Sequence, residues 1–409
     1  MNVAPNNSRI DFSFLVSPRR DKDKPIYRWH SYKHSFSKEL VDNFIEEFKL
    51  NEDSMVLDPF VGSGTTLLAC KDKKISGIGY DISPFAVFLT KTKLRNYNKN
   101  ELIEALKIIA SKKRNGTSNK SYDFPDIPLL KKAYKKNIWN EILSIRDKIF
   151  KIKNQKNRNF FLLALFSILE SVSNTTKSGG FLRITQRDVK KKMVLKKFLE
   201  SASSMINDLE NKKVRGNGTI LKTFVGDARK LKTKDKFDAI ITSPPYMNRH
   251  DYTRIYSLEL ILNFVKNNSE LKNLRYKTLR SHVEARKRYS ANGYKKPAEL
   301  NQLLKKIKSN GVNNIQIVDM IEGYFEDMYL AIKEMKNVLR RSGKIALVVS
   351  NVRFSGINIP VDEILGRIGE NIGLNLIEIR IARFRGNSSQ QMRDYKRSNS
   401  RESIIIWGN

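Results

Sequence analysis

Short apolar segments alternate with longer amphipathic segments along most of this chain. Six segments are brief and either rich in β-branched residues or bounded by glycine, which predicts buried strands. Between them, apolar residues recur at helical spacing, and one such segment opens with Ser37 followed by Glu39, a favourable helix start. The predicted strands are Met55–Leu57, Ile75–Tyr80, Phe237–Thr242, Lys344–Val349, Leu374–Ala382 and Ser403–Trp407, and the predicted helices are Ser37–Phe48, Thr65–Lys73, Pro84–Leu94 and Ile317–Leu339.

This alternation is typical of an α/β fold with a doubly wound, mostly parallel sheet. The last two strands are joined by a polar, arginine-rich segment, Gly386–Arg401, so we expect an antiparallel hairpin at one edge of the sheet. Residues 101–220 interrupt the alternation. They are predicted to be mostly helical, over Glu101–Lys112, Leu129–Ile152, Arg158–Ser173 and Asp188–Lys213, with a loop at Ser173–Gly180.

The composition adds a strong positive charge to this picture. The 409 residues include 77 Lys and Arg against 42 Asp and Glu, a formal net charge of +35, and residues 101–220 and 266–310 carry 25 of those charges. Such a charge indicates binding to nucleic acid or to an anionic membrane surface. We therefore divide the chain into a near-neutral part at 1–100, a basic helical insertion at 101–220, and a part at 221–409 that contains a second basic insertion at 266–310.

The composition also excludes several classes of protein. A single cysteine excludes a disulfide framework and a cysteine-based zinc site. No apolar run is long enough to span a bilayer, and the N-terminus lacks the layout of a signal peptide. We expect a soluble, cytoplasmic protein.

A glycine-containing turn follows the first predicted strand. The segment Val56–Cys70 reads VLDPFVGSGTTLLAC, in which Gly62 and Gly64 lie between a strand and a helix. Glycines at such a turn let the backbone approach a ligand that a Cβ would block. The next strand ends at Asp81, an acidic residue that can accept hydrogen bonds from ribose hydroxyls. The turn matches neither the dinucleotide fingerprint nor the P-loop, and alone it is also compatible with an ordinary tight turn.

A second motif, Ser243-Pro244-Pro245-Tyr246, ends the strand at Phe237–Thr242. The two prolines stop the strand and fix an extended turn. The Ser243 hydroxyl and the Pro244 carbonyl are acceptors, and Tyr246 offers a flat aromatic face, a combination that suits a planar base with an exocyclic amino group. Upstream, in the segment TFVGDARKL, Asp227 is placed to bond the adenine amino group of a nucleoside cofactor.

Together these residues resemble the amino-methyltransferases of DNA, which methylate an exocyclic nitrogen with S-adenosylmethionine. The family patterns Asp-Pro-Phe-x-Gly-x-Gly-Thr and [Asn/Asp/Ser]-Pro-Pro-[Tyr/Phe/Trp] stand here at Asp58–Thr65 and Ser243–Tyr246, and the segment Tyr27–Ile45 looks like the helix that precedes the glycine loop. The resemblance implies a Rossmann-like methyltransferase sheet of the seven-stranded type, flipping of the target base, and no metal. It assigns catalysis to Ser243, Pro244, Pro245 and Tyr246, and cofactor binding to Asp58, Pro59, Phe60, Gly62, Gly64, Thr65, Asp81, Ile82, Asp227 and Ala228.

The resemblance also bears on which nitrogen is methylated. In this family Ser-Pro-Pro-Tyr leans to N4 of cytosine, whereas Asp- or Asn-Pro-Pro-Tyr leans to N6 of adenine, so we favour cytosine N4 and keep adenine N6 as the alternative. Methylation at cytosine C5 needs a nucleophilic cysteine at a Pro-Cys turn, and Cys70 lies instead in the helix after the glycine loop. An RNA base methyltransferase and a catalytically dead nucleic-acid-binding protein are the other interpretations.

The expected partners are double-stranded DNA and, if the protein belongs to a restriction-modification system, a cognate restriction endonuclease in a bacterial or archaeal cytoplasm. Either basic insertion could read the DNA. Candidate contacts are Asn248, Arg249, His250, Asp251 and Tyr252 after the catalytic turn, Lys177 and Arg183 in the predicted loop, and Gln390 and Gln391 near the C-terminus.

Overall fold

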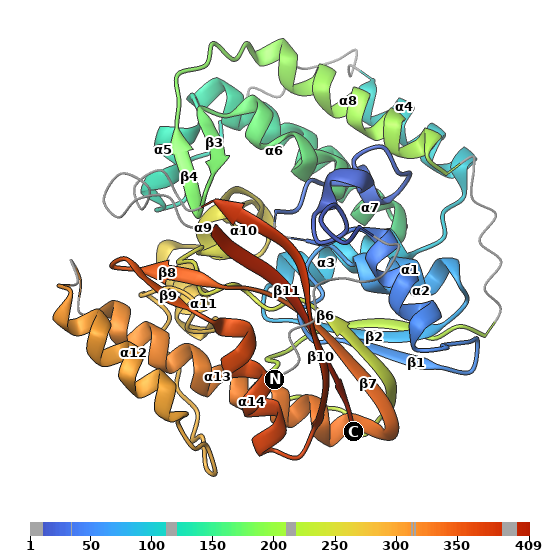
Figure 1. The fold of residues 1–409 in the computed structure, drawn as a ribbon. Helices are drawn as coiled ribbons and strands as arrows, with labels where there is room; N and C mark the ends of the chain where they lie inside the picture. Colours follow the sequence, from blue (N-terminus) through green and yellow to red (C-terminus); the bar gives the residue numbers. More distant parts are fainter. Residues whose placement is uncertain are drawn as a thin grey trace.

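A sheet of seven strands forms the centre of the molecule in a computed structural model, which describes residues 11–33, 35–111, 121–209, 218–311, 314, 316–386 and 399–409 (Figure 1). Its order is β10-β11-β7-β6-β1-β2-β5. Neighbours from β7 to β5 are parallel, and β11 runs antiparallel to both β7 and β10. The strands are β1 (Met55–Asp58), β2 (Ser76–Asp81), β5 (Leu221–Val225), β6 (Phe237–Thr242), β7 (Leu339–Ser350), β10 (Asn375–Gly386) and β11 (Asn399–Gly408).

This architecture confirms the predicted doubly wound, mostly parallel α/β fold. The predicted antiparallel hairpin is also confirmed, because β10 and β11 pair at the edge of the sheet. Its connecting residues 387–398 lie outside the described residues, and with them the candidate DNA contacts Gln390 and Gln391.

Helices cover both faces of the sheet because alternate residues of each strand point to opposite sides. Ile240 of β6 packs in a cluster with α13 (Gln316–Val338) and α14 (Val361–Asn371). Its neighbours Ala239 and Ile241 pack in a cluster with α1 (Lys38–Glu47) and α2 (Thr65–Asp72). Cys70 lies in α2, the helix after the glycine loop, as predicted; it is fully buried in that second cluster, and burial raises the pKa of its thiol.

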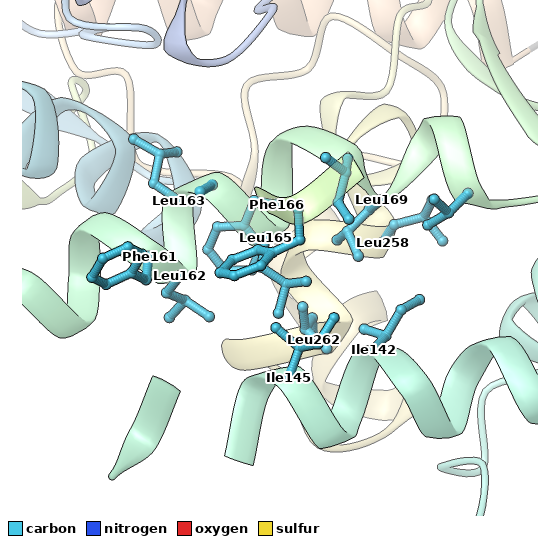
Figure 2. Close-up of a cluster of buried hydrophobic side chains, with 14 of the residues drawn as sticks. Ile142, Ile145, Phe161, Leu162, Leu163, Leu165, Phe166, Leu169, Leu258 and Leu262 are labelled. Carbon is cyan, nitrogen blue, oxygen red and sulfur yellow. The ribbon is translucent and has the colours of Figure 1, made fainter. Parts of the chain in front are cut away.

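The insertion at 101–220 is built on a core that it shares with the sheet layer. Helix α7 packs against α6 and against α10, the helix that follows the catalytic turn, and Figure 2 shows their side chains meeting. Phe85 and Leu89 of α3 belong to the same core. The helices are α3 (Pro84–Leu94), α4 (Lys99–Ala110), α5 (Pro128–Ala133), α6 (Lys136–Phe150), α7 (Gln155–Ile168), α8 (Lys191–Asn207) and α10 (Ser257–Asn263).

Two predictions for the insertion are wrong. The helix predicted over Leu129–Ile152 is two helices, because Tyr134 adopts an extended backbone and its buried hydroxyl donates to the Leu169 carbonyl at 3.0 Å. The loop predicted at Ser173–Gly180 contains a strand, β3 (Thr175–Ser178), which pairs with β4 (Phe181–Ile184) as an antiparallel hairpin. Its polar residues are compatible with a strand because Lys177 forms a buried ion pair with Glu259.

The second basic segment, residues 266–310, is anchored by buried charges. Asp327 of α13 accepts from Arg280 (Nη2 to Oδ1, 2.7 Å) and from Arg229 (Nη1 to Oδ2, 2.7 Å), and all three residues are buried. The segment contains α11 (Asn268–Lys277) and α12 (Ala298–Ser309), and the remaining short elements are α9 (Tyr252–Ile255), β8 (Val352–Phe354), β9 (Ile357–Ile359) and the 3-10 turns Pro18–Asp21, Tyr27–Trp29 and Glu170–Val172. No helix in the described part of the chain combines the length and apolar character needed to cross a membrane.

We expect Asp327→Ala to destabilise the fold strongly, because it leaves two buried guanidinium groups without their shared carboxylate. Removal of one partner from a buried ion pair typically costs about 3–5 kcal/mol. The measurement is the free energy of unfolding in urea. Asp319→Ala is the matched control, since Asp319 lies on the same helix but is exposed, and should change stability by less than about 0.5 kcal/mol. Equal effects of the two substitutions would contradict this role for Asp327.

Candidate active site

The two sequence motifs meet at the carboxyl ends of β1 and β6, where the strand order reverses. Ligands of open α/β sheets bind at such switch points. A buried hydrogen bond of 2.6 Å, from the Thr242 hydroxyl to Asp58 Oδ1, joins the two strand ends. A cavity opens there, and its lining includes the predicted residues Asp58, Pro59, Phe60, Gly62, Thr65, Asp81, Ile82, Asp227, Ala228, Ser243 and Pro245.

The two glycines of the loop have different roles. Gly62 lines the cavity with φ +47°, and a Cβ there would lie 3.2 Å from the Tyr32 ring. Gly64, the N-cap of α2, has φ +82°, and a Cβ there would lie 2.7 Å from the Thr90 side chain. Gly64 is therefore required for packing against α3, and it is not among the residues that line the cavity.

Two carboxyl groups flank the glycine loop, Asp58 buried and Asp81 half-buried at the cavity wall. Asp81 accepts from the backbone N–H of Gly62 at 3.0 Å and of Ser83 at 2.8 Å, one on each oxygen. Since a carboxylate has about four acceptor positions, this leaves capacity for ribose hydroxyls at the cavity wall. Burial raises the pKa of both Asp58 and Asp81 to about 6.

Asp227 follows β5, the edge strand that pairs with β2, and it lines the cavity next to Asp81 at the end of β2. Its carboxylate is held by the Arg229 guanidinium, from Nε at 2.9 Å and from Nη2 at 2.8 Å, and by the Tyr289 hydroxyl at 3.0 Å. Burial opposes ionisation, but the hydrogen bonds and charge of Arg229 lower the pKa of Asp227 below its ordinary value. Asp227 is therefore a fixed, ionised acceptor, and its bond to a cofactor amino group stays a prediction.

The four residues of the Ser243–Tyr246 motif differ in how far they are buried. Ser243 and Pro245 line the cavity, whereas Pro244 is buried and Tyr246 is only 6% exposed. The Ser243 hydroxyl donates to the Val348 carbonyl of β7 at 3.1 Å, so its lone pairs remain available as acceptors. The Tyr246 hydroxyl donates to Glu402 of β11 at 2.8 Å, which fixes the ring, and the stacking of a base on this ring stays a prediction.

Sequence reasoning did not assign several residues of the cavity wall. Tyr32 stacks on Tyr256 with ring centroids 4.5 Å apart, and the family resemblance of the segment Tyr27–Ile45 was its only signal. The turn between Thr278 and His282 closes another side of the cavity, although the sequence indicated only a basic segment there. The unassigned lining residues include Tyr32, Ser35, Phe36, Leu274, Thr278, Leu279, Ser281 and His282.

The candidate DNA contacts after the Ser243–Tyr246 turn differ in where their side chains lie. His250 and Tyr252 line the cavity, and burial, with the nearby charges of Lys33 and Arg385, lowers the pKa of His250 to about 4, so its ring is neutral at physiological pH. Asp251 is buried as the N-cap of α9 and pairs with Arg275 at 2.7 Å, a structural role.

Lys177 is not a surface phosphate ligand, contrary to the sequence expectation. Its ammonium is buried against Glu259 and lies 4.6 Å from the centre of the Tyr256 ring. Burial opposes ionisation of Glu259, but the charge of Lys177 and a hydrogen bond from His30 lower its pKa to about 2. Arg183, the other candidate in that segment, is exposed. Among the described side chains, no group of three or more His, Cys, Asp or Glu is placed to hold a metal ion.

A family model and two similar proteins agree on one family. A family model described as "DNA methylase", of the N6/N4 type, matches residues 6–92. The chain is 34% identical to the type II methyltransferase M.BsoBI of Geobacillus stearothermophilus, over 96% of this chain and 87% of that protein. It is 31% identical to the type II methyltransferase M.AvaI of Nostoc, over 96% of this chain and 88% of that protein. Among solved structures, the rRNA methyltransferase AviRa of Streptomyces viridochromogenes matches with a TM-score of only 0.31 at 10% identity, over 98% of this chain and 94% of that chain.

We expect the affinity for an adenosyl cofactor to fall as the pH falls through about 6. The physical reason is that an ionised Asp81 is the predicted acceptor for ribose hydroxyls, and protonation at its raised pKa of about 6 makes it a much weaker acceptor. Below that pKa the loss approaches tenfold per pH unit for a single linked proton. Calorimetric titration with S-adenosylhomocysteine, which is not turned over, measures the effect.

Asp81→Asn should bind the same compound more weakly and with a flat pH profile. Asp58→Asn is the matched control, because Asp58 also lines the cavity and has the same raised pKa. If Asp58→Asn flattened the profile and Asp81→Asn did not, the two carboxyl groups would have been assigned the wrong way round.

Proposed function

The chain belongs to the type II DNA methyltransferases of the N6/N4 class, and we propose that it methylates N4 of cytosine within a specific sequence of double-stranded DNA. The observation that carries the proposal is the state of Ser243 at the cavity wall. Its hydroxyl proton is used by the Val348 carbonyl, so the oxygen faces a substrate as a neutral acceptor. In the family that the motif resembles, serine at this position leans to cytosine N4.

The residues around the cavity fit S-adenosylmethionine, the methyl donor of this family. Gly62 leaves the loop without a Cβ at the wall, Asp81 offers acceptors for the ribose, and Phe36 and Phe60 supply apolar surface. We assign the cofactor to the end of β1 and β2, and the target base to the end of β6. When bound, the cofactor supplies an electrophilic methyl group on a sulfonium.

The protein's share of the reaction is positioning and hydrogen bonding. A free exocyclic amine is a poor nucleophile because its lone pair is delocalised into the ring. In the proposed geometry, Ser243 Oγ and the Pro244 carbonyl accept the two amino hydrogens, which turns the nitrogen lone pair toward the methyl group and stabilises the positive charge that develops on it. The nitrogen then gains the methyl group as the methyl–sulfur bond breaks, the electron pair of that bond stays on the sulfur of S-adenosylhomocysteine, and one amino proton is released to solvent. Holding the two groups in line supplies much of the remaining rate enhancement.

The base has to leave the duplex to reach this cavity. We propose that the two basic insertions, 101–220 and 266–310, hold the DNA around it, and that residues 1–100 and 221–409 form the catalytic part. Exposed cations are present on both insertions, including Lys131, Lys132, Lys135, Lys151 and Lys153 on the first and Lys272, Lys295, Lys305, Lys306 and Lys308 on the second. We also propose a cognate restriction endonuclease as the biological partner, the usual context of a type II methyltransferase.

The direct test is to express the protein in a bacterial host, digest the genomic DNA to nucleosides and analyse them by mass spectrometry. We expect N4-methylcytosine. N6-methyladenine would support the adenine alternative, and methylated nucleosides in RNA alone would overturn the DNA assignment. A Ser243→Ala variant is the control, because it removes the proposed acceptor and should abolish the mark.

Replacement of Tyr246 separates the roles of its ring and its hydroxyl. Tyr246→Ala should lower kcat by at least about a hundredfold, since it removes both the stacking surface and the bond to Glu402, while binding of S-adenosylhomocysteine stays near wild type. Tyr246→Phe keeps the ring and should retain most of the turnover. Cofactor affinity that falls in Tyr246→Ala as far as in Asp81→Asn would show that Tyr246 belongs to the cofactor site instead.

A further inference from the structure

We propose that the β3–β4 hairpin is a DNA wedge whose tip residue, Phe181, enters the base stack and occupies the place vacated by the flipped base. This inference rests on the proposed function, because it needs a base that leaves the duplex. It assigns a positioning role to a hairpin that the sequence indicated only as a loop.

The tip of the hairpin lies at the rim of the cavity. The turn consists of Gly179, with φ +57°, and Gly180, which is followed directly by Phe181. A Cβ at Gly180 would lie 2.8 Å from Cδ2 and 3.0 Å from Cα of His250, a residue that lines the cavity. The hairpin therefore rests directly on the loop that follows the catalytic turn, next to where a flipped base would enter.

The end of the hairpin opposite its tip is held in place by contacts with the rest of the protein. Lys177 of β3 is buried against Glu259 of α10, and its carbonyl accepts from the Lys33 ammonium. Arg187, just after β4, donates to Thr176 Oγ1 at 2.6 Å and to the Glu170 carbonyl at 2.9 Å. A side chain that separates stacked bases must not yield when it meets them, and these contacts supply a rigid support.

The outer face of the hairpin presents an aromatic side chain, which can stack on bases, and a cation, which can contact phosphate. Residues paired across an antiparallel hairpin share a face, so Phe181, opposite Ser178, lies on the same side as Arg183, opposite Thr176. Lys177 and its partner Leu182 lie on the other, inner side. Phe181 is 53% exposed and Arg183 is exposed, which places an aromatic ring and a free cation together. Apolar side chains inserted between base steps are a known way to open a duplex.

A second exposed aromatic residue provides the rival candidate. Phe384 of β10 is 62% exposed, but it lines a separate groove with Leu303 of α12 and Pro360, not the cavity with the glycine loop. Phe181 directly follows Gly180, which packs against His250 of the cavity wall, whereas Phe384 belongs to the wall of the separate groove. We therefore assign the wedge to Phe181 and use Phe384 as the matched control.

The experiment compares methylation of two duplexes that carry the protein's own target sequence, identified by sequencing methylated DNA. One duplex is fully paired, and the other has an abasic site opposite the base that the wild-type protein methylates, whichever base that is. We expect Phe181→Ala to lower kcat/KM on the paired duplex by at least about fivefold, the scale of one lost base-stacking contact. On the abasic duplex it should come within about twofold of wild type, because that base is already unpaired.

The controls separate a wedge from other roles. Since Phe181 is half exposed, alanine should leave the melting temperature and S-adenosylhomocysteine binding unchanged, and Phe181→Leu should retain most activity as an apolar replacement. An unchanged rate for Phe181→Ala on paired DNA, or an equal loss on both duplexes, overturns the wedge. Rescue by the abasic site in Phe384→Ala instead would assign the role to the β10–β11 hairpin. A wild-type protein that methylates neither duplex overturns the proposed function itself, and the wedge with it.

Discussion

The buried hydrogen bond between Thr242 and Asp58 is the contact on which the geometry of the site depends. It joins the ends of β6 and β1 through two residues that are 184 positions apart in the sequence, and the two strands are neighbours in the sheet. Because the glycine loop begins at one of these residues and the Ser243–Tyr246 turn follows the other, this contact and the pairing of β1 with β6 together fix the distance between the proposed cofactor and base sites. Asp58 is thus a structural tie that also lines the cavity, and its role in cofactor binding stays a prediction.

A second constraint couples the helical insertion to the catalytic turn. Glu259 lies on α10, beyond α9 on the C-terminal side of that turn, and its buried carboxylate pairs with Lys177 of the hairpin and with His30 of the N-terminal segment. Neither strand of the hairpin belongs to the central sheet, so without these contacts the hairpin would have little to hold it. An ionised group buried this deeply requires its partners, which means that the three segments form their final arrangement together.

The sequence was sufficient for most of the sheet and for the motif residues of the cavity wall. Strands such as Phe237–Thr242 and helices such as Pro84–Leu94 were predicted with the bounds observed, because burial on both faces gives an unbroken apolar run and proline and glycine mark the ends. The wall formed by Thr278 to His282 was not predictable. Those residues reach the cavity through the long-range pairing of Arg280 with Asp327, which leaves no local pattern. The hairpin at Thr175–Ile184 was missed for the same reason, since its polar strand depends on a distant carboxylate.

Buried ion pairs of this kind reduce the number of positive charges that are available to bind DNA. Several cations near the cavity are paired inward: Arg229 and Arg280 with Asp327, Arg275 with Asp251, and Lys177 with Glu259. These groups maintain the fold and are not free to release counterions from DNA, so they should contribute little to its salt dependence. The exposed lysines on the outer helices remain for phosphate contacts. Near the cavity itself, His250 and Tyr252 line the proposed path of a flipped base as neutral groups, and the half-exposed Phe181 lies beside it. In the proposed function, exposed charge attracts DNA, whereas uncharged side chains at the rim contribute to the extrusion of one base.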